Sequence, residues 1–230
     1  TPAEFGEDRQ PSQSYLLIPK VSSENRDFVP LGFLKPEVII NPSVLVVPMA
    51  GLFEFGILQS TMHMAWMRAT CGRLESRYQY SASIVYNNFP WPDLGTAVRK
   101  PAQGANEPNS ESKAPNPSVE RPQAAIEIAA QGVLDARARF QSGEHPGSLA
   151  ATLADLYDPL TMPPELLKAH QKLDAAVDKA YEASGGKKSY KSDAERVAFL
   201  FELYQRLTGL LPADKTKGGR RAKAAPAEVK

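Results

Sequence analysis

Three short apolar runs near the start of the chain predict β-strands. They are Tyr15–Pro19, Phe28–Phe33 and Val44–Pro48, each rich in aromatic or branched residues and bounded by Pro, Gly, Ser or Asn. Because proline has no N–H to give to a strand ladder, the proline in each run is expected at a strand end or a sheet edge. The runs therefore predict a small sheet.

The spacing of apolar residues becomes helical over residues 53–73. Gly56 and Ser60 are expected to divide this stretch into two helices, and Gly72 is expected to end the second one. Two segments without a helical period follow, an extended stretch, Glu75–Tyr80, and an aromatic closing loop, Ser81–Pro92.

The second half of the chain has helical spacing throughout. Apolar residues repeat at three or four over residues 122–140 and 163–181. Ser192 and Glu195 have the spacing of a capping box, which predicts a further helix start. Three or four such helices pack as a small antiparallel bundle. The expected fold class is α+β, a small mixed module followed by a helical bundle.

Two biased segments set the expected domain boundaries. Residues 95–120 contain four prolines and little apolar surface, so we expect a flexible linker. Residues 212–230 are rich in Lys, Arg, Gly and Ala, so we expect a disordered basic tail. The expected modules are therefore 1–94 and 121–211.

Composition removes several classes of function. The 230 residues carry 27 basic and 26 acidic side chains, a formal net charge of +1, so no global field draws the chain to nucleic acid or anionic lipid. No apolar run reaches about 18 residues, so we expect no membrane partner. A single cysteine fits a reducing, cytoplasmic location. The chain begins with Thr1, and we expect it to be part of a longer polypeptide.

Catalytic and metal-binding patterns are not evident. His63, His145 and His170 lie too far apart for metal ligands on one helix turn. His63 and the neighbouring Met and Trp residues are expected to be core. Asp174 and Asp178 have the spacing of a solvated helix face, so we assign no acid–base role to them.

Several longer motifs resemble one family. The runs His63-Met-Ala-Trp-Met-Arg68, Cys71-Gly-Arg-Leu74 and Ile84-Val-Tyr-Asn-Asn-Phe-Pro-Trp-Pro92 closely resemble the target-recognition domain of MmeI-like (type IIL) DNA methyltransferases and restriction-modification enzymes. Leu156-Tyr-Asp-Pro-Leu-Thr-Met-Pro-Pro164 and residues 194–204 resemble the C-terminal helical domain of that family. The resemblance covers residues 13–211 outside the expected linker.

The resemblance implies a division of labour. In that family an upstream Rossmann-type domain binds S-adenosylmethionine and methylates adenine N6. None of its motifs occur here, so no cofactor is expected in this chain and no activity of its own. The implied partners are double-stranded DNA and an upstream methyltransferase domain of the same polypeptide.

Glu75 and Arg77 take the base-reading role that the resemblance implies. Members of the family carry Glu-x-Arg or Lys-x-Asp at this place, and Gly72-Arg73-Leu74 and Tyr78 fix the alignment. Glu accepts from cytosine N4, and Arg donates to guanine O6 and N7, so the two side chains match both halves of a C·G pair. In an extended segment, residues two apart share a face. The alternative is a surface ion pair without function.

Other polar residues are further candidates for DNA contact, and for each a solvated turn or a helix cap is the alternative. A polar loop follows the first predicted strand, two residues precede the third, and two arginines flank the end of the second helix. These candidates are Lys20, Ser22, Ser23, Glu24, Asn25 and Arg26, then Asn41 and Ser43, then Arg68 and Arg73.

Two other functions stay open. The near-neutral charge of the first module suits a protein–protein interaction module whose helical bundle docks a partner. A stand-alone enzyme would require methyl transfer by this chain alone. Salt-sensitive binding to duplex DNA separates the first alternative from DNA recognition.

Overall fold

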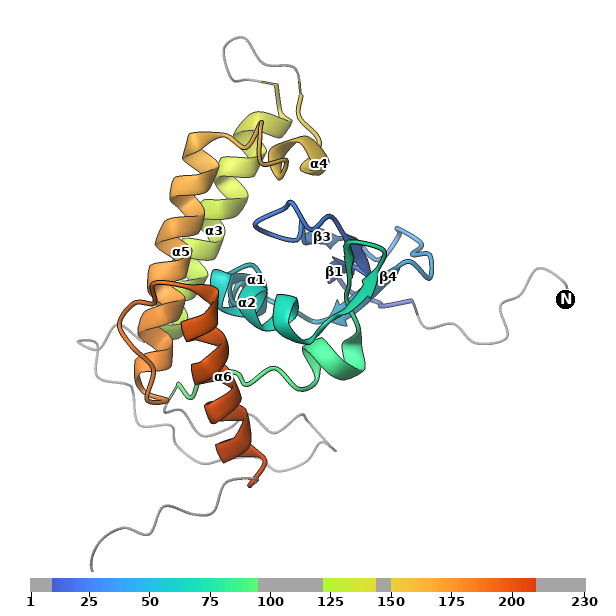
Figure 1. Ribbon diagram of the computed structural model, residues 1–230. Coiled ribbons are helices and arrows are strands. Elements are labelled where there is room, and N and C mark those ends of the chain that lie inside the picture. Colours follow the sequence, from blue (N-terminus) through green and yellow to red (C-terminus); the bar gives the residue numbers. More distant parts are fainter. Residues whose placement is uncertain (1–9, 95–121, 144–149, 210–230) are drawn as a thin grey trace, which may run out of the picture.

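A computed structural model describes residues 10–94, 122–143 and 150–209. Two three-stranded antiparallel sheets are followed by a set of helices (Figure 1), which confirms the predicted α+β class. The expected linker and basic tail lie outside the described residues, as does His145. No described helix is long and apolar enough to cross a membrane.

The first sheet has the order β3-β1-β4 and the second β2-β6-β5. Their strands are β1 (Tyr15–Pro19), β2 (Val21–Ser22), β3 (Gly32–Leu34), β4 (Val44–Pro48), β5 (Gly72–Leu74) and β6 (Arg77–Gln79). Lys20 joins the two sheets, because its N–H donates to the carbonyl of Ser43 at 3.0 Å and its carbonyl accepts from the N–H of Tyr80 at 2.7 Å.

The predicted strands at Tyr15–Pro19 and Val44–Pro48 are confirmed as β1 and β4. The prediction of a strand over Phe28–Phe33 is wrong for residues 28–31, since only Gly32–Leu34 pairs with β1. The closing loop also differs from its prediction, because Ala82–Tyr86 forms a π-helical turn, η1. The carbonyl of Val85, within that turn, accepts a hydrogen bond from the indole N–H of Trp66 at 3.0 Å.

The helices agree with their patterns, except for one short helix, Leu153–Leu156, that no pattern predicted. They are α1 (Leu52–Leu58), α2 (Thr61–Thr70), α3 (Pro122–Gln141), α4 (Leu153–Leu156), α5 (Pro164–Glu182) and α6 (Asp193–Leu207). Ser60 caps α2 by accepting from the N–H of His63. The capping box before α6 is only half formed. The Ser192 hydroxyl accepts from the N–H of Glu195, but the Glu195 carboxylate accepts from the N–H of Lys191.

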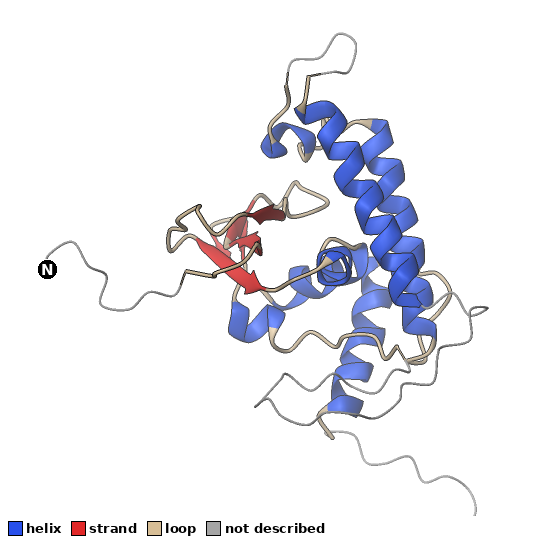
Figure 2. Cartoon of the chain, turned by 180° about the vertical axis from the view of Figure 1, so that it is seen from behind, coloured by secondary structure: helices blue, strands red, loops and turns tan. Residues whose placement is uncertain are grey.

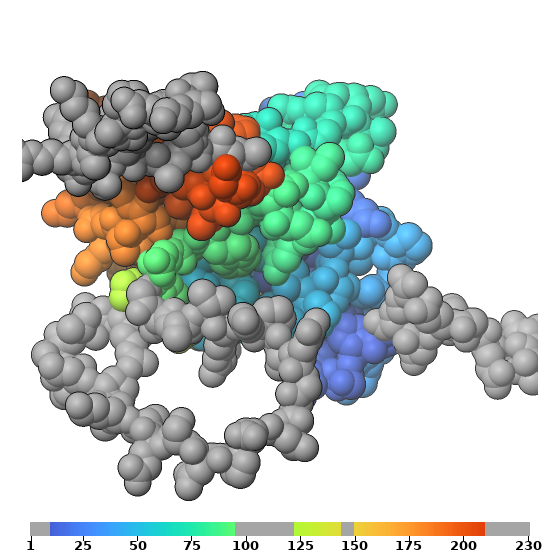
Figure 3. Space-filling model, turned by 90° about the horizontal axis from the view of Figure 1, so that it is seen from below, coloured from blue at the N-terminus to red at the C-terminus, as the bar shows by residue number. Residues whose placement is uncertain are grey.

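One continuous core joins the two halves of the chain. Figures 1 and 2 show α3 and α5 side by side as one wall, with α1 and α2 between that wall and the sheets. Trp66 of α2 contacts the rings of Phe201 and Tyr204 of α6. Figure 3 shows the segment that ends near residue 94 lying against α6. The helices therefore brace the sheet-bearing part directly.

Asp174 and Asp178 do not lie on a solvated face, so that prediction is wrong. Asp174 accepts a hydrogen bond from the N–H of Thr61 at 2.7 Å, and Asp178 is 5% exposed and faces Arg196 at 3.4 Å. The side of α5 that looks polar in sequence packs against the start of α2 and against α6. A helical pattern cannot reveal this, because it contains no information about polar partners in distant elements.

Candidate nucleic-acid interface

The hairpin of β5 and β6 carries the two residues expected to read a base pair. Leu74 pairs with Arg77, so Glu75 and Ser76 form a two-residue turn instead of continuing a strand. The prediction of one extended segment over Glu75–Tyr80 is therefore wrong at its start. The backbone of Glu75 has φ 56°, a left-handed conformation that side chains other than glycine, asparagine and aspartate adopt at an energetic cost.

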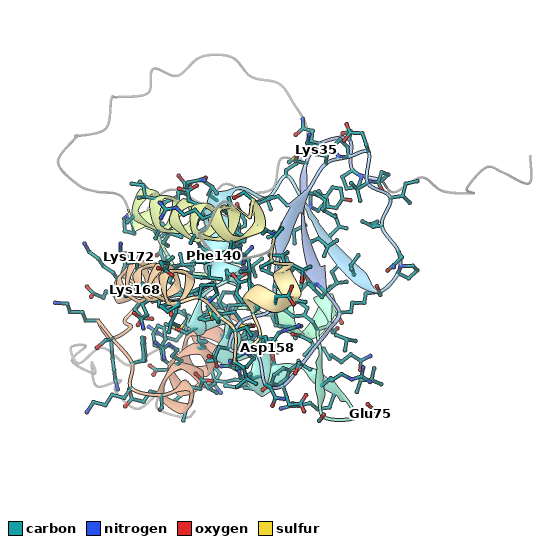
Figure 4. The ribbon with its side chains drawn as sticks, turned by 90° about the horizontal axis from the view of Figure 1, so that it is seen from above. Lys35, Glu75, Phe140, Asp158, Lys168 and Lys172 are labelled. Atoms are coloured by element: carbon teal, nitrogen blue, oxygen red, sulfur yellow. The ribbon has the colours of Figure 1, made fainter. Side chains whose placement is uncertain are left out.

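Glu75 and Arg77 nevertheless point the same way. The Glu75 carboxylate accepts from Arg77 Nη2 at 2.8 Å, and their side chains are 78% and 46% exposed. Figure 4 shows Glu75 at the outer tip of the hairpin, away from the helices. The turn, and not the two-residue repeat of a strand, brings them together. The pair presents one acceptor group and one fork of donors to solvent.

Arg73 stiffens the base of the turn. Its guanidinium lies 4.1 Å from the centre of the Tyr78 ring and donates to the carbonyl of Ser76 at 2.8 Å. Both contacts fall inside the hairpin, and Arg73 remains exposed. One arginine therefore holds the turn while it adds positive charge beside Glu75 and Arg77.

The polar loop, residues 20–26, approaches the same turn from β2. Ser22, the last residue of β2, pairs with Tyr78, and in the turn that follows the side chain of Glu24 hydrogen-bonds Ser76. The hydrogen bond with Ser76 is the largest cause that lowers the pKa of Glu24, followed by a backbone hydrogen bond and then by Arg73 and Arg77. Glu24 therefore carries its charge at the edge of the hairpin tip.

The rest of that loop is ordered by short local bonds. Ser23 Oγ accepts from the N–H of Asn25 at 3.2 Å, and the N–H of Arg26 donates to the carbonyl of Ser23 at 3.3 Å. Ser22 is 5% exposed, so its hydroxyl does not reach the surface that the other residues share. The exposed parts of the loop are those that follow β2.

Asn41 and Ser43 lie beside Lys20. Asn41 Oδ1 accepts from both the N–H and the hydroxyl of Ser43, and Lys20 Nζ donates to the carbonyl of Pro42 at 2.6 Å. The structure thus brings this segment to the junction of the two sheets. Strand β2 leads from this junction to the β5–β6 hairpin. The candidates from three separate segments therefore lie on or beside neighbouring strands.

Arg68, like Ser22, does not present its polar group to the shared surface. Its Nη1 contacts the carboxylate of Asp193, the first residue of α6, and its Nη2 donates to the carbonyl of Asp27, both at 2.7 Å. Its side chain is 24% exposed. The guanidinium is therefore occupied within the protein.

One buried arginine near this region was missed by the sequence reasoning. Arg137 is 3% exposed, donates through Nη1 to the carbonyl of Leu31 at 2.6 Å and through Nε to the hydroxyl of Tyr157 at 2.7 Å. A signal was present, because Arg137 stands four residues after Val133 on the apolar stripe of α3. An arginine in such a stripe must find partners inside the protein.

The histidines do not form a reactive site. His63 and His170 are buried, and desolvation lowers the pKa of each to about 3, so both are neutral near pH 7. His63 bonds the hydroxyl of Tyr80 and His170 that of Tyr157. The prediction that His63 is core is confirmed. Within the described ranges, no group of three or more His, Cys, Asp or Glu residues could hold a metal ion.

A separate groove lies between α3 and α5 and has a volume of about 620 Å³. Alanines of both helices line it, and Lys168 and Lys172 stand at its rim. Figure 4 places these two lysines on the far side of the molecule from Glu75. This groove and the hairpin tip are therefore separate surfaces.

Comparisons with known proteins give one consistent result. Residues 1–93 match the family description "MmeI, target recognition domain", and residues 119–212 match "MmeI, C-terminal domain". DNA methyltransferase A of Bacillus subtilis (strain 168) is 37% identical over 208 residues, 90% of this chain and 20% of that protein.

A solved structure gives the same result. The type IIL restriction-modification enzyme MmeI in complex with DNA superposes with a TM-score of 0.69 at 45% identity, over 90% of this chain and 23% of that one. The chain thus spans about a fifth of the length of the proteins that it matches. It belongs to the MmeI family, of which it contains the target-recognition and C-terminal domains.

Proposed function

We propose that this chain is the DNA-specificity portion of an S-adenosylmethionine-dependent adenine-N6 DNA methyltransferase of the restriction-modification type. The observation that carries the proposal is the exposed Glu75–Arg77 pair at the tip of the β5–β6 hairpin. A similar chain has been solved in complex with DNA. The proposed partner is double-stranded DNA, read in its major groove.

The chemistry of the pair fits one base pair. A carboxylate accepts from cytosine N4, and a guanidinium donates to guanine O6 and N7, so Glu75 and Arg77 together complement C·G. The ion pair between them contributes only about 0–1 kcal/mol at such exposure, so it can open when better partners arrive. The left-handed backbone of Glu75 supports a functional role, because glycine would suit that turn with less strain.

The neighbouring residues supply the remaining contacts in this proposal. Lys20, Arg26 and Arg73 are suited to phosphates, whereas Ser23, Asn25, Asn41 and Ser43 are short polar groups that can reach base edges or the backbone. Glu24 hydrogen-bonds Ser76 and adds a second acceptor at the tip. Arg68 is not assigned a DNA contact, because Asp193 and Asp27 already occupy its guanidinium.

The cofactor belongs to another part of the polypeptide in this proposal. The sheets of the described residues are antiparallel and have three strands each, unlike the parallel sheet of a Rossmann-type domain. This difference supports a cofactor site outside the described residues. An upstream methyltransferase domain would bind it, and this chain would place the target sequence before that domain.

A gel shift with a pool of random duplexes at low and moderate salt tests the proposal. Each phosphate that the protein neutralises contributes about −0.9 to the slope of log K against log salt. We expect binding that weakens steeply with salt and a slope that is smaller by about one unit in Arg73→Gln. No binding at low salt would favour the alternative, a protein-interaction module with its partner surface on the helices.

A further inference from the structure

The segment 27–31, here called the stem, connects the polar loop 20–26 to β3. Its side chains Phe28, Val29 and Leu31 are buried, yet the stem is not a strand. Gln59, between α1 and α2, donates to the carbonyl of Val29 at 3.0 Å and accepts from the N–H of Leu31 at 3.4 Å. The side chain of Gln59 thus makes the two backbone hydrogen bonds that a neighbouring strand would otherwise make.

Two arginines hold the ends of the stem. Arg68 of α2 donates to the carbonyl of Asp27 at 2.7 Å, and Arg137 of α3 donates to the carbonyl of Leu31 at 2.6 Å. Each also bonds a residue in the C-terminal part of the chain, Asp193 for Arg68 and Tyr157 for Arg137. The stem is therefore clamped from both ends by the helices.

Arg137 is buried, and its surroundings restrict where its guanidinium can lie. Its guanidinium lies between the rings of Phe55 and Tyr157, at 5.1 and 4.8 Å, and the described residues provide it with no carboxylate partner. Burial lowers its pKa, and the hydroxyl of Tyr157 opposes that shift. Nη2 of Arg137 is buried without a hydrogen-bond partner among the described residues. Because burying a cation costs free energy, the loss of its remaining bonds would be costly, so the bond from Nη1 to the carbonyl of Leu31 is a strong positional restraint.

We infer that Arg68 and Arg137 are positioning residues for DNA recognition. By holding the carbonyls of Asp27 and Leu31, they fix the loop 20–26 against the Glu75–Ser76 turn, so the helical domain contributes to base selectivity without touching a base. The inference rests on the proposed function. Its physical basis is that a reading group must stay within about 0.5 Å of its working position, and Glu24 is only three residues from the stem.

Charge-preserving variants test this inference. Lysine keeps the positive charge but lacks the fork of donors, so Arg68→Lys cannot serve both Asp193 and Asp27. Arg137→Lys makes the equivalent change at the other end of the stem. Arg139→Lys is the matched control, because Arg139 is exposed on the same helix as Arg137. Three measurements are made on the intact chain: amide hydrogen exchange, selection of duplexes from a random pool, and the salt dependence of duplex binding.

The two stem variants are expected to exchange the amides of residues 20–26 about tenfold faster, while amides in the middle of α5 are unchanged. The preference for the best selected duplex over the unselected pool is expected to fall about tenfold, within the range that one base contact spans. The salt slope stays the same, because no charge is lost. Arg139→Lys is expected to match the unmodified chain in all three respects.

Unchanged loop exchange in a folded Arg68→Lys chain would overturn the inference, even if Arg137→Lys does not fold. Equal weakening for every duplex would also overturn it, because Arg68 would then be contacting phosphate. If the unmodified chain binds no duplex at all, the proposed function fails, and the exchange measurement still decides whether the arginines position the loop.

Discussion

The carboxylate of Asp174 accepts a hydrogen bond from the backbone N–H of Thr61, 113 residues earlier, at 2.7 Å. Thr61 is the first residue of α2, where backbone N–H groups have no partner inside the helix. A residue of α5 thus completes the start of a helix that belongs to the target-recognition domain. The two domains are tied together by a charged hydrogen bond as well as by their common core.

Replacement of Asp174 by alanine is expected to destabilise the whole chain. It leaves the N–H of Thr61 without its partner, and hydrogen bonds to charged groups contribute about 1.5–3 kcal/mol. Urea unfolding measures the loss as a lower midpoint. Glu202→Ala, an exposed residue of α6, is the control and should stay within about 0.5 kcal/mol of the unmodified chain. Equal midpoints for the two variants would contradict the prediction.

Asp178 makes stability depend on pH. Burial raises its pKa to about 6, against the opposing effect of Arg196, whereas an unfolded aspartate titrates near pH 4. The folded chain therefore binds more protons between pH 4 and 6, so this residue lowers stability as the pH rises through that window. Above pH 6 its contribution is constant.

The variant Asp178→Asn tests that dependence. We expect the unfolding free energy of the unmodified chain to fall by on the order of 1–2 kcal/mol, relative to that of the variant, as the pH rises from 4 to 7. The comparison of the two chains removes the opposite contributions of Asp155 and Glu195, whose pKa values are lowered. Parallel pH profiles would refute the assignment.

Gly56 marks the closest approach of α1 to α3. A Cβ atom there would lie 2.7 Å from Ile126 Cγ2 and 3.2 Å from the Cβ of Ala130. Gly56→Ala is therefore expected to lower the unfolding free energy by about 1–3 kcal/mol through overpacking. Gly132 is a matched control on α3, since nothing lies within 4 Å of its added Cβ.

Gly132→Ala should raise the stability by about 0.5–1 kcal/mol, because alanine is the better helix former. Thermal unfolding of the two variants gives the comparison. We expect shifts of opposite sign in the melting temperature. A rise for Gly56→Ala would show that α1 and α3 are not packed as closely as described.

The left-handed backbone of Glu75 predicts that stability and recognition oppose each other at that position. Glu75→Gly relieves the strain and is expected to stabilise the chain by up to about 1 kcal/mol, while it removes the acceptor for cytosine. The melting temperature should rise and duplex selectivity should fall. Gln79→Gly, in the exposed strand β6, should lower the melting temperature. Destabilisation by Glu75→Gly would argue against strain at the turn.

The sequence predicts the long helices well because each buries its own apolar stripe against the core, and that stripe is visible as a local pattern. The break between α1 and α2 follows from Ser60, which caps α2, whereas the expected break at Gly56 is wrong because α1 continues through it. Strands β1 and β4 follow from their branched residues. The motifs around Trp66 and in residues 84–92 identify the family. The site is predicted only as a set of candidate residues, since their arrangement depends on pairing between segments nearly sixty residues apart, such as Val21 with Gln79.

The errors have a common cause. The stem reads as a strand because its residues are apolar, but its backbone partners are the side chains of Gln59, Arg68 and Arg137. Asp174 reads as a surface residue because its partner, the N–H of Thr61, is invisible in a helical pattern. Side-chain bonds across long sequence separations carry no local signal.

The central claim is that Glu75 and Arg77 read one base pair. The double variant Glu75→Lys, Arg77→Asp exchanges acceptor for donor at both positions while it keeps an opposite-charge pair at the tip. The control is Lys187→Glu with Glu195→Lys, which reverses another exposed ion pair far along the chain. Both are placed in a polypeptide that joins this chain to the methyltransferase domain that the proposed function requires.

Mapping of N6-methyladenine over a plasmid by sequencing then gives the recognition site of each variant. A bidentate contact discriminates by about 1–3 kcal/mol, enough to change which sites are methylated. The account predicts that C is replaced by G at one position of the site in the Glu75/Arg77 variant, with every other position retained and the control unchanged. An active double variant that methylates the original site would contradict it.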